Sequence, residues 1–167
     1  MDRRAKRIAV LGIIFAATAA HASNAVAQTV KDISGTWKLA AARVTSDGKT
    51  RDIFGPHPAG IMVFDAGGRF VQVIIAADIP KFASKGRETG TADENKAVVQ
   101  GSIAYFGTYS VSSGGIVDLH VESSTFPNMT SSDQKRSIKL TGDEMIWGNP
   151  TPAVGSGVAE QVWRRAK

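Results

Sequence analysis

Three side chains on two neighbouring predicted strands combine a base, an acid and a cation: His120, Glu122 and Arg136. Arg136 alternates in phase with Ile138 and Leu140, so strand periodicity predicts that its guanidinium points into the protein. An unpaired buried guanidinium is very costly, so we expect Arg136 to pair with Glu122. Our hypothesis is a hydrogen-bonded trio in the floor or wall of a cavity. If the protein is an enzyme, we expect His120 to act as a general base, with Arg136 or a tyrosine stabilising developing negative charge.

Two structural interpretations of the same residues stay open. Leu119 and Val121 alternate with His120 and Glu122, and phase alone sends the polar residues outward to solvent. Alternatively, the two residues and Arg136 form an internal network that fixes strand register and binds nothing.

Further residues of a binding cavity are expected on the inner faces of other strands. Tyr105 and Tyr109 share one face of their strand and would contribute hydroxyl groups. The expected apolar lining is Met62, Phe64, Met145 and Trp147. Small-ligand sites typically combine such apolar walls with a few convergent polar groups.

Several enzyme classes lack their motifs in this sequence. After residue 27 the chain has two histidines, His57 and His120, and neither is spaced with another ligand as a metal site requires. No Gly-x-Ser-x-Gly elbow, phosphate-binding loop or Gly-x-Gly-x-x-Gly motif is present. We therefore expect no metal and no cofactor, and neither hydrolase nor nucleotide chemistry.

Residues 1–27 have the three-part layout of a secretory signal peptide. A basic segment (3–7) precedes an apolar stretch of 13 residues (8–20), which is shorter than the roughly 20 residues that a spanning helix needs. Small residues then offer cleavage after Ala22 or after Ala27. We expect cleavage after Ala27, and the alternative is an uncleaved anchor.

The composition fits one exported domain over residues 28–167. The full chain of 167 residues is 43% hydrophobic, 7% aromatic and 21% charged, which supports a single packed core and excludes a disordered chain. Residues 1–27 hold four of the 20 Lys and Arg and one of the 15 Asp and Glu. The net charge therefore falls from +5 for the full chain to +2 for residues 28–167, and we expect no nucleic-acid binding. The chain has no cysteine, hence no disulfide and no lipidation site. We expect a periplasmic or secreted protein without a stable membrane anchor.

Short segments with period-2 alternation, separated by turn residues, fill residues 28–167. Strands are predicted at residues 35–41, 50–54, 61–65, 69–76, 102–111, 116–125, 135–140, 144–147 and 158–165. Tight connections imply antiparallel neighbours, and eight or nine such strands close into an up-and-down barrel. We therefore predict an all-β fold with a closed or nearly closed antiparallel barrel.

One long connection interrupts the strands at residues 77–101. Thr91 and Glu94 form a capping-box pattern, which predicts a short helix over residues 92–100. The segment is either a surface connector or a lid over the barrel mouth.

Residues near both ends of the predicted barrel resemble lipocalins. Gly35-Thr36-Trp37 is similar to the Gly-x-Trp that marks the first lipocalin strand. Lipocalin-type barrels often stack a C-terminal arginine on that tryptophan, as a cation–π contact. The resemblance implies that Arg165, after Trp163, stacks on Trp37, with Arg164 as the alternative.

An ordered set of motifs over nearly all of residues 28–167 resembles the bacterial and fungal lipocalin-like domain family. The motifs are Gly35-Thr36-Trp37-Lys38-Leu39, Phe54-Gly55-Pro56-His57-Pro58-x-Gly60, Asp65-x-Gly67-Gly68-Arg69, Ala104-Tyr105-Phe106-Gly107-Thr108-Tyr109 and His120-Val121-Glu122-x-Ser124-x-Phe126-Pro127-Asn128. The resemblance implies a small-molecule-binding barrel, and some members lie beside natural-product enzymes as suspected cyclases or isomerases. Leu119 departs from the family pattern, in which many members have a second histidine before His120.

Three functions follow from these observations. The first is an exported barrel that binds or carries a small hydrophobic or amphipathic molecule. The second is a cofactor-independent isomerase or cyclase that acts on such a molecule, with His120 as general base. The third is a structural or interaction module with a filled interior. An open cavity separates the first two from the third.

Overall fold

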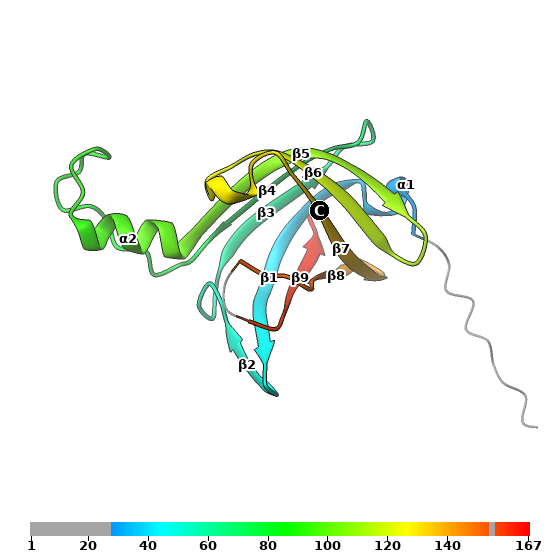
Figure 1. Ribbon diagram of the computed structural model, residues 1–167, viewed down its shortest axis with the longest axis horizontal. Helices are drawn as coiled ribbons and strands as arrows, with labels where there is room; N and C mark the ends of the chain where they lie inside the picture. The colour runs from blue at the N-terminus through cyan, green and yellow to red at the C-terminus, as the bar shows by residue number, and fades with distance from the viewer. Residues whose placement is uncertain (1–27, 154–155) are drawn as a thin grey trace, which may run out of the picture.

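Eight antiparallel strands close into a ring in the computed structural model of the chain, which describes residues 28–153 and 156–167 (Figure 1). The strands are β1 (Gly35–Ser46), β2 (Lys49–Asp52), β3 (Ala59–Phe64), β4 (Arg69–Ile75), β5 (Ser102–Ser112), β6 (Ile116–Ser124), β7 (Ser132–Thr141), β8 (Glu144–Asn149) and β9 (Val158–Arg165). Strands β3 to β9 pair with their neighbours in chain order, and β1 closes the ring by pairing with both β3 and β9. The short strand β2 pairs with the C-terminal end of β1, at residues 43–46. The predicted all-β barrel is confirmed, and the predicted signal peptide lies outside the described residues.

The predicted strands are all present, and their ends differ most at β1 and β7. β1 continues to Ser46 instead of ending at Ala41, and β7 begins at Ser132 instead of Lys135. β1 turns into β2 through Asp47 and Gly48, whose φ angles of 50° and 73° lie in the left-handed region. That region suits a two-residue Asp-Gly hairpin turn.

A β-bulge changes which side chains of β1 face inward. Leu39 lies opposite Trp163 and Ala41 lies opposite Val162, so one residue between them has no partner on β9. The side-chain phase changes at this point, and beyond it Ala42 is buried at 1% exposure. Simple alternation from Trp37 and Leu39 would place Ala41 on the same face, but the bulge interrupts this alternation.

A short helix, α1 (Val30–Ile33), closes one end of the barrel and was not predicted. The Asp32 carboxylate accepts hydrogen bonds from the Thr29 amide and hydroxyl, at 2.8 and 2.7 Å, and caps the helix. The side chain of Ile33 is fully buried, and its carbonyl accepts a 2.8 Å hydrogen bond from the indole Nε1 of Trp37. α1 thus plugs the barrel at the start of β1.

Arg165 fastens the end of β9 to this plug. Its guanidinium carbon lies 4.2 Å from the ring centroid of Trp37, which confirms the expected cation–π contact. Nη1 donates to the Ser34 carbonyl at 2.8 Å and Nη2 donates to the Asp32 carbonyl at 2.7 Å. Gly35 keeps the approach open, because a Cβ atom there would lie 3.1 Å from Nη1 of Arg165. One cation therefore joins α1, β1 and β9.

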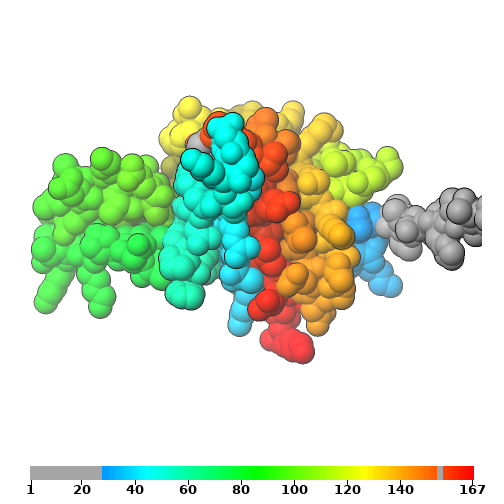
Figure 2. Space-filling view, turned by 90° about the horizontal axis from the view of Figure 1, so that it is seen from below, coloured from blue at the N-terminus to red at the C-terminus, as the bar shows by residue number. Residues whose placement is uncertain are grey.

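The predicted helix is confirmed as α2 (Ala92–Gly101), within a segment that we call the arm (residues 77–101). The Glu94 carboxylate accepts from the Thr91 and Ala83 amides, each at 2.8 Å, which joins the helix start to the preceding loop. The arm projects sideways from the barrel and stands apart from it in the space-filling view (Figures 1 and 2). It adds no buried residue from α2 to the core.

Candidate functional site

A cavity of about 310 Å³ lies toward the barrel end that α1 leaves open. Its walls come from the segment after β2, from β4, β5, β7, β8 and β9, from η1 (Pro127–Met129) and from the loop after β8. The lining residues are Ile53, Phe54, Gln72, Ile103, Tyr105, Asn128, Met129, Ser132, Asp133, Gln134, Arg136, Asn149, Thr151, Pro152, Ala153, Ala159 and Gln161. No residue of the arm is among them, so the arm fits the connector interpretation and not the lid.

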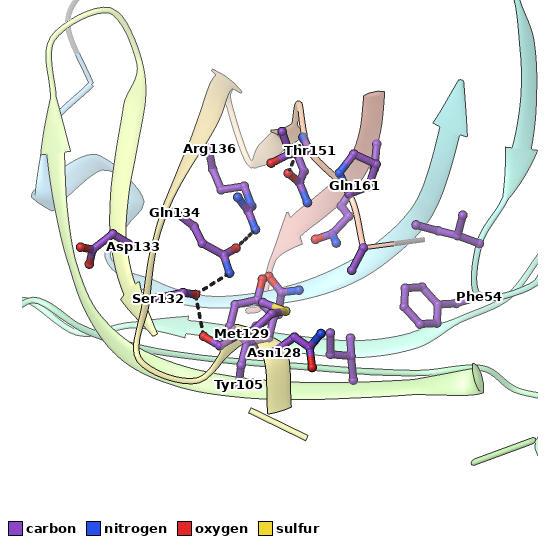
Figure 3. A pocket seen from close by; sticks show the side chains of 17 residues that line it. Phe54, Tyr105, Asn128, Met129, Ser132, Asp133, Gln134, Arg136, Thr151 and Gln161 are labelled. Carbon is purple, nitrogen blue, oxygen red and sulfur yellow. Dashed lines mark hydrogen bonds between the residues drawn. The ribbon is translucent and has the colours of Figure 1, made fainter. Parts of the chain in front are cut away.

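Arg136 reaches into this cavity from β7, as strand phase predicted, and is only 4% exposed (Figure 3). Its Nη1 donates to the Lys135 carbonyl at 2.8 Å, and its Nη2 donates to Oε1 of Gln134. Gln134 in turn donates through Nε2 to the Ser132 hydroxyl at 3.1 Å, and that hydroxyl donates to the Met129 carbonyl at 2.6 Å. This chain of hydrogen bonds ties the guanidinium to the η1 backbone and holds its position.

Gln72 and Tyr105, which lie opposite each other on β4 and β5, form a second polar group in the wall. Gln72 is 1% exposed, and its Oε1 has no hydrogen-bond partner among the described residues. Burial raises the pKa of the Tyr105 phenol, while the nearby charge of Arg136 opposes this shift. The phenol therefore stays protonated at neutral pH and offers both a donor and an acceptor.

The rest of the wall is mostly apolar on one side. Ile53 and Phe54 enter from the segment after β2, Ile103 from β5, Met129 from η1 and Ala159 from β9. Figure 3 shows Phe54 across the cavity from Arg136. The cavity thus has a polar side and an apolar side, and its volume is near the lower end of the usual range for small-molecule sites.

The predicted trio of polar residues does not form. His120 is exposed, and its Nδ1 lies 2.7 Å from Oδ1 of Asp133 on the outer face. Glu122 accepts two hydrogen bonds from Arg69, at 2.7 and 2.9 Å, also outside the barrel. Arg136 alone of the three lines the cavity, so the hypothesis of a hydrogen-bonded trio in the wall is wrong.

The phase of β6 explains the outward placement of the acid and the base. Leu119 and Val121 are buried, at 2% and 0% exposure, and they occupy the inner face that the hypothesis gave to His120 and Glu122. A bulge opposite Phe106 and Gly107 leaves Glu122 without a partner in the β5 register. The alternative based on phase alone was correct for these two residues.

The expected apolar lining and Tyr109 belong to the packed core between the cavity and α1. The four apolar residues are at most 1% exposed, and none lines the cavity: Met62, Phe64, Met145 and Trp147. The Tyr109 ring packs edge-on against Phe64 at 4.8 Å, and its hydroxyl donates to the Asp65 carbonyl at 2.7 Å. Burial raises the pKa of this phenol too. These five were expected at the cavity because they face inward, but facing inward does not specify depth along the barrel.

Three glutamine residues of the wall were missed: Gln72, Gln134 and Gln161. Gln161 accepts a 3.1 Å hydrogen bond from the Trp163 indole. Strand phase could have found two of them, because Gln72 alternates with Phe70 and Ile74 on the buried face of β4, and Gln161 alternates with Trp163. Gln134 lies just before the predicted strand 135–140 and was outside its reach. Polar residues in phase with a buried face are the signal that was overlooked.

The charge of the wall is carried by few groups. Arg136 and Asp133 are the lining residues with charged side chains, and Asp133 points away from the cavity (Figure 3). Its Oδ1 instead lies 2.7 Å from Nδ1 of His120. Within residues 28–153 and 156–167, no group of three or more His, Cys, Asp or Glu is placed to hold a metal ion. In the same part of the chain, no helix has the length and apolar character needed to cross a membrane.

A profile of the lipocalin-like domain matches residues 34–166, which span the whole ring from the start of β1 to the end of β9. The chain belongs to the lipocalin-like domain family. The predicted family is therefore confirmed, and lipocalin-like barrels typically bind small hydrophobic ligands. No curated protein matches the chain.

Proposed function

We propose that this lipocalin-like protein binds a small, partly apolar molecule inside the cavity at the open end of its barrel. The observation that carries the proposal is the cavity of about 310 Å³, with apolar walls around buried polar groups that include Arg136 and Gln72. Buried polar groups cost free energy unless they find partners, and a ligand supplies such partners. Family membership supports the same reading.

The cavity favours binding over a solid structural module. The core beside α1 is filled by three tryptophans and their neighbours, so a module with a packed interior would extend this filling along the barrel. Instead, small and polar residues such as Ala159 and Gln161 occupy the corresponding inner positions of β9. The space they leave is accessible to a ligand.

A fluorescent probe tests this proposal directly. N-phenyl-1-naphthylamine is uncharged and brightens in apolar surroundings, so we expect saturable fluorescence enhancement on addition to the purified protein. Ala159→Leu adds three carbon atoms to a residue that is 3% exposed and lines the cavity, and it should weaken probe binding at least about tenfold. Ala59→Leu, on the exposed start of β3, is the matched control and should leave binding unchanged. Equal effects of the two substitutions, or no saturable enhancement, would contradict the proposal.

The enzyme alternative is weakened by the position of its proposed base. His120 lies on the outer face beside Asp133 and is not among the residues that line the cavity. We therefore expect His120→Ala to bind the probe as the unsubstituted protein does. A selective loss of binding in this variant would restore His120 to the site.

We further propose that residues 1–27 are a signal peptide removed after Ala27, so that the protein acts in the periplasm or outside the cell. The proposed cut precedes α1 and leaves intact the plug residues that bond to Trp37 and Arg165. The N-terminal sequence of the protein isolated from its own host tests this. We expect it to start at Gln28, whereas an intact start at Met1 would contradict the proposal.

A further inference from the structure

The guanidinium of Arg136 is buried without a counter-charge. At 4% exposure it forms no ion pair with any carboxylate in residues 28–153 and 156–167. Both of its hydrogen-bond acceptors are neutral, one a backbone carbonyl and the other the amide oxygen of Gln134. A buried charge without an opposite charge carries a desolvation cost of several kcal/mol in typical proteins.

The carboxylates on β7 and on its neighbour β6 are all engaged on the outer surface. Asp118 bonds to Lys135, Asp133 to His120, and Glu122 to Arg69. Each of these pairs lies on the face opposite to the cavity, so none is placed to neutralise Arg136. Asp133 also lines the cavity but points away from it, so Arg136 is the charged lining side chain that points inward (Figure 3).

The guanidinium also has donors to spare. It carries five N–H groups, and the hydrogen bonds to Lys135 and Gln134 use two of them. Next to it, the amide of Gln72 has an unpartnered Oε1, and a half-turn of that amide would present its NH₂ group at the same place. With the Tyr105 hydroxyl, these groups can surround an acceptor-rich group on a ligand.

We infer that the cavity is specific for a small monocarboxylate, whose carboxylate binds Arg136 and whose apolar body contacts the Phe54 side. This inference rests on the proposed binding function and adds the chemical class of the ligand. A planar carboxylate matches the fork of a guanidinium with two parallel hydrogen bonds. A phosphate monoester would bring close to two negative charges against the single cation and leave one of them buried without a partner.

Three probes of the same shape separate charge from fit: 4-phenylbutanoate, 4-phenylbutanamide and 4-phenylbutylamine. Their dissociation constants are measured by displacement of N-phenyl-1-naphthylamine at pH 7 and low ionic strength. We expect the carboxylate to bind at least about tenfold more tightly than the amide, and the ammonium compound to bind most weakly, since charge-assisted hydrogen bonds are stronger than neutral ones. Equal binding of the three probes would overturn the inference while leaving the cavity function intact.

Two substitutions on β7 assign the preference to Arg136. Arg136→Met should cost the carboxylate at least about tenfold in affinity, and should change amide binding by less than about threefold. Lys135→Met removes the same charge from the neighbouring residue, which is exposed on the outer face, and should leave the ratio of carboxylate to amide affinity unchanged. A preference that persists in Arg136→Met, or that falls equally in both variants, would overturn the inference.

The outcomes distinguish this inference from the proposed function. If N-phenyl-1-naphthylamine itself fails to bind, the cavity proposal fails; if it binds but no phenylbutyl probe displaces it, only the carboxylate inference fails. Near-ultraviolet circular dichroism checks that Arg136→Met keeps its tertiary packing, because Arg136 also holds Gln134. If that variant does not fold, the ratio measured on the unsubstituted protein decides the question, and Arg136→Lys, which keeps the charge but loses the fork, should lower that ratio.

Discussion

Replacing Arg165 with methionine removes a cation that joins α1, β1 and β9. The methionine keeps much of the apolar length of the arginine and can still pack on Trp37, so the change isolates the guanidinium. Two hydrogen bonds to the carbonyls of Ser34 and Asp32 are lost, together with the cation–π contact and a 3.8 Å ion pair with Asp143. The matched control is Arg164→Met, because Arg164 points to solvent and has one 3.5 Å contact with Glu144.

The expected loss follows from these contacts. Removing a charged donor costs about 1.5 to 3 kcal/mol for each hydrogen bond, and the lower value applies here because the Arg165 side chain is 32% exposed and water can reach the freed carbonyls. The cation–π contact adds about 0.5 to 1 kcal/mol. Since neighbouring contributions are not fully additive, we expect Arg165→Met to lower the free energy of unfolding by about 3 kcal/mol. Arg164→Met should cost at most about 0.5 kcal/mol, as surface ion pairs do.

Urea unfolding followed by tryptophan fluorescence measures both variants, because Trp37 reports directly on the contact. The midpoint of unfolding should fall to a clearly lower urea concentration for Arg165→Met and hardly change for Arg164→Met. The dependence of the free energy of unfolding on urea concentration should be the same for both variants. A loss below about 1 kcal/mol for Arg165→Met, or equal losses for the two variants, would refute the idea that this cation fastens the barrel ends.

Three further predictions concern other parts of the fold. Gly107→Ala places a Cβ atom 1.9 Å from the backbone oxygen of His120, so we expect it to lower the free energy of unfolding by about 3 kcal/mol or more in urea. The control Gly114→Ala lies in open space at a φ of 75° and should lower it by only about 1 to 2 kcal/mol. Similar losses for the two variants would contradict the clash. Gln72→Met removes an unpartnered buried oxygen and should leave stability unchanged or raise it by about 1 kcal/mol, so a clear loss in the absence of ligand would show that this oxygen has a partner. Hydrogen bonds from the Ala83 and Thr91 amides lower the pKa of Glu94 in the folded protein. The ionised carboxylate therefore stabilises the arm fully at pH values above the ordinary glutamate pKa of about 4.3. This stabilisation is lost as the pH falls through the lower pKa of the folded state. Hydrogen-exchange protection of the Ala83 amide, corrected for intrinsic rates, should fall over that acidic range in the unsubstituted protein, and a protection that stays constant would contradict the prediction.

The strands were predictable because each one keeps a simple local pattern between turn residues. β9 was predicted with its observed bounds, and α2 began at the predicted Ala92 after its capping residues. α1 was missed because its four residues carry too little periodicity to signal a helix, and its stability comes from contacts with β1 and β9. The bulge in β1 was invisible for a related reason, since it depends on the pairing with β9 and leaves no mark in the local alternation.

The candidate site was predicted only where one strand sufficed to decide it. Arg136 was assigned inward from its own strand, correctly, because Ile138 fixes the phase. Its supposed partner was wrong because Glu122 pairs with Arg69 on the outer face. His120 pairs with Asp133, which lies directly opposite it in a part of β7 that was predicted as loop. Cross-strand pairs need the register, and the depth of the cavity needs the packing of the whole ring. Neither can be read from the spacing within one strand.

The ring closes through its latest strand, and this has a consequence for how the protein is made. β1 must wait for β9 to emerge, and the Arg165 bond to Ser34 spans 131 positions of the chain. Contacts between such distant segments form slowly, and until then β1 and β8 each present an open edge. A growing polypeptide therefore stays unfinished during most of its synthesis and depends on protection from aggregation until the final strand arrives.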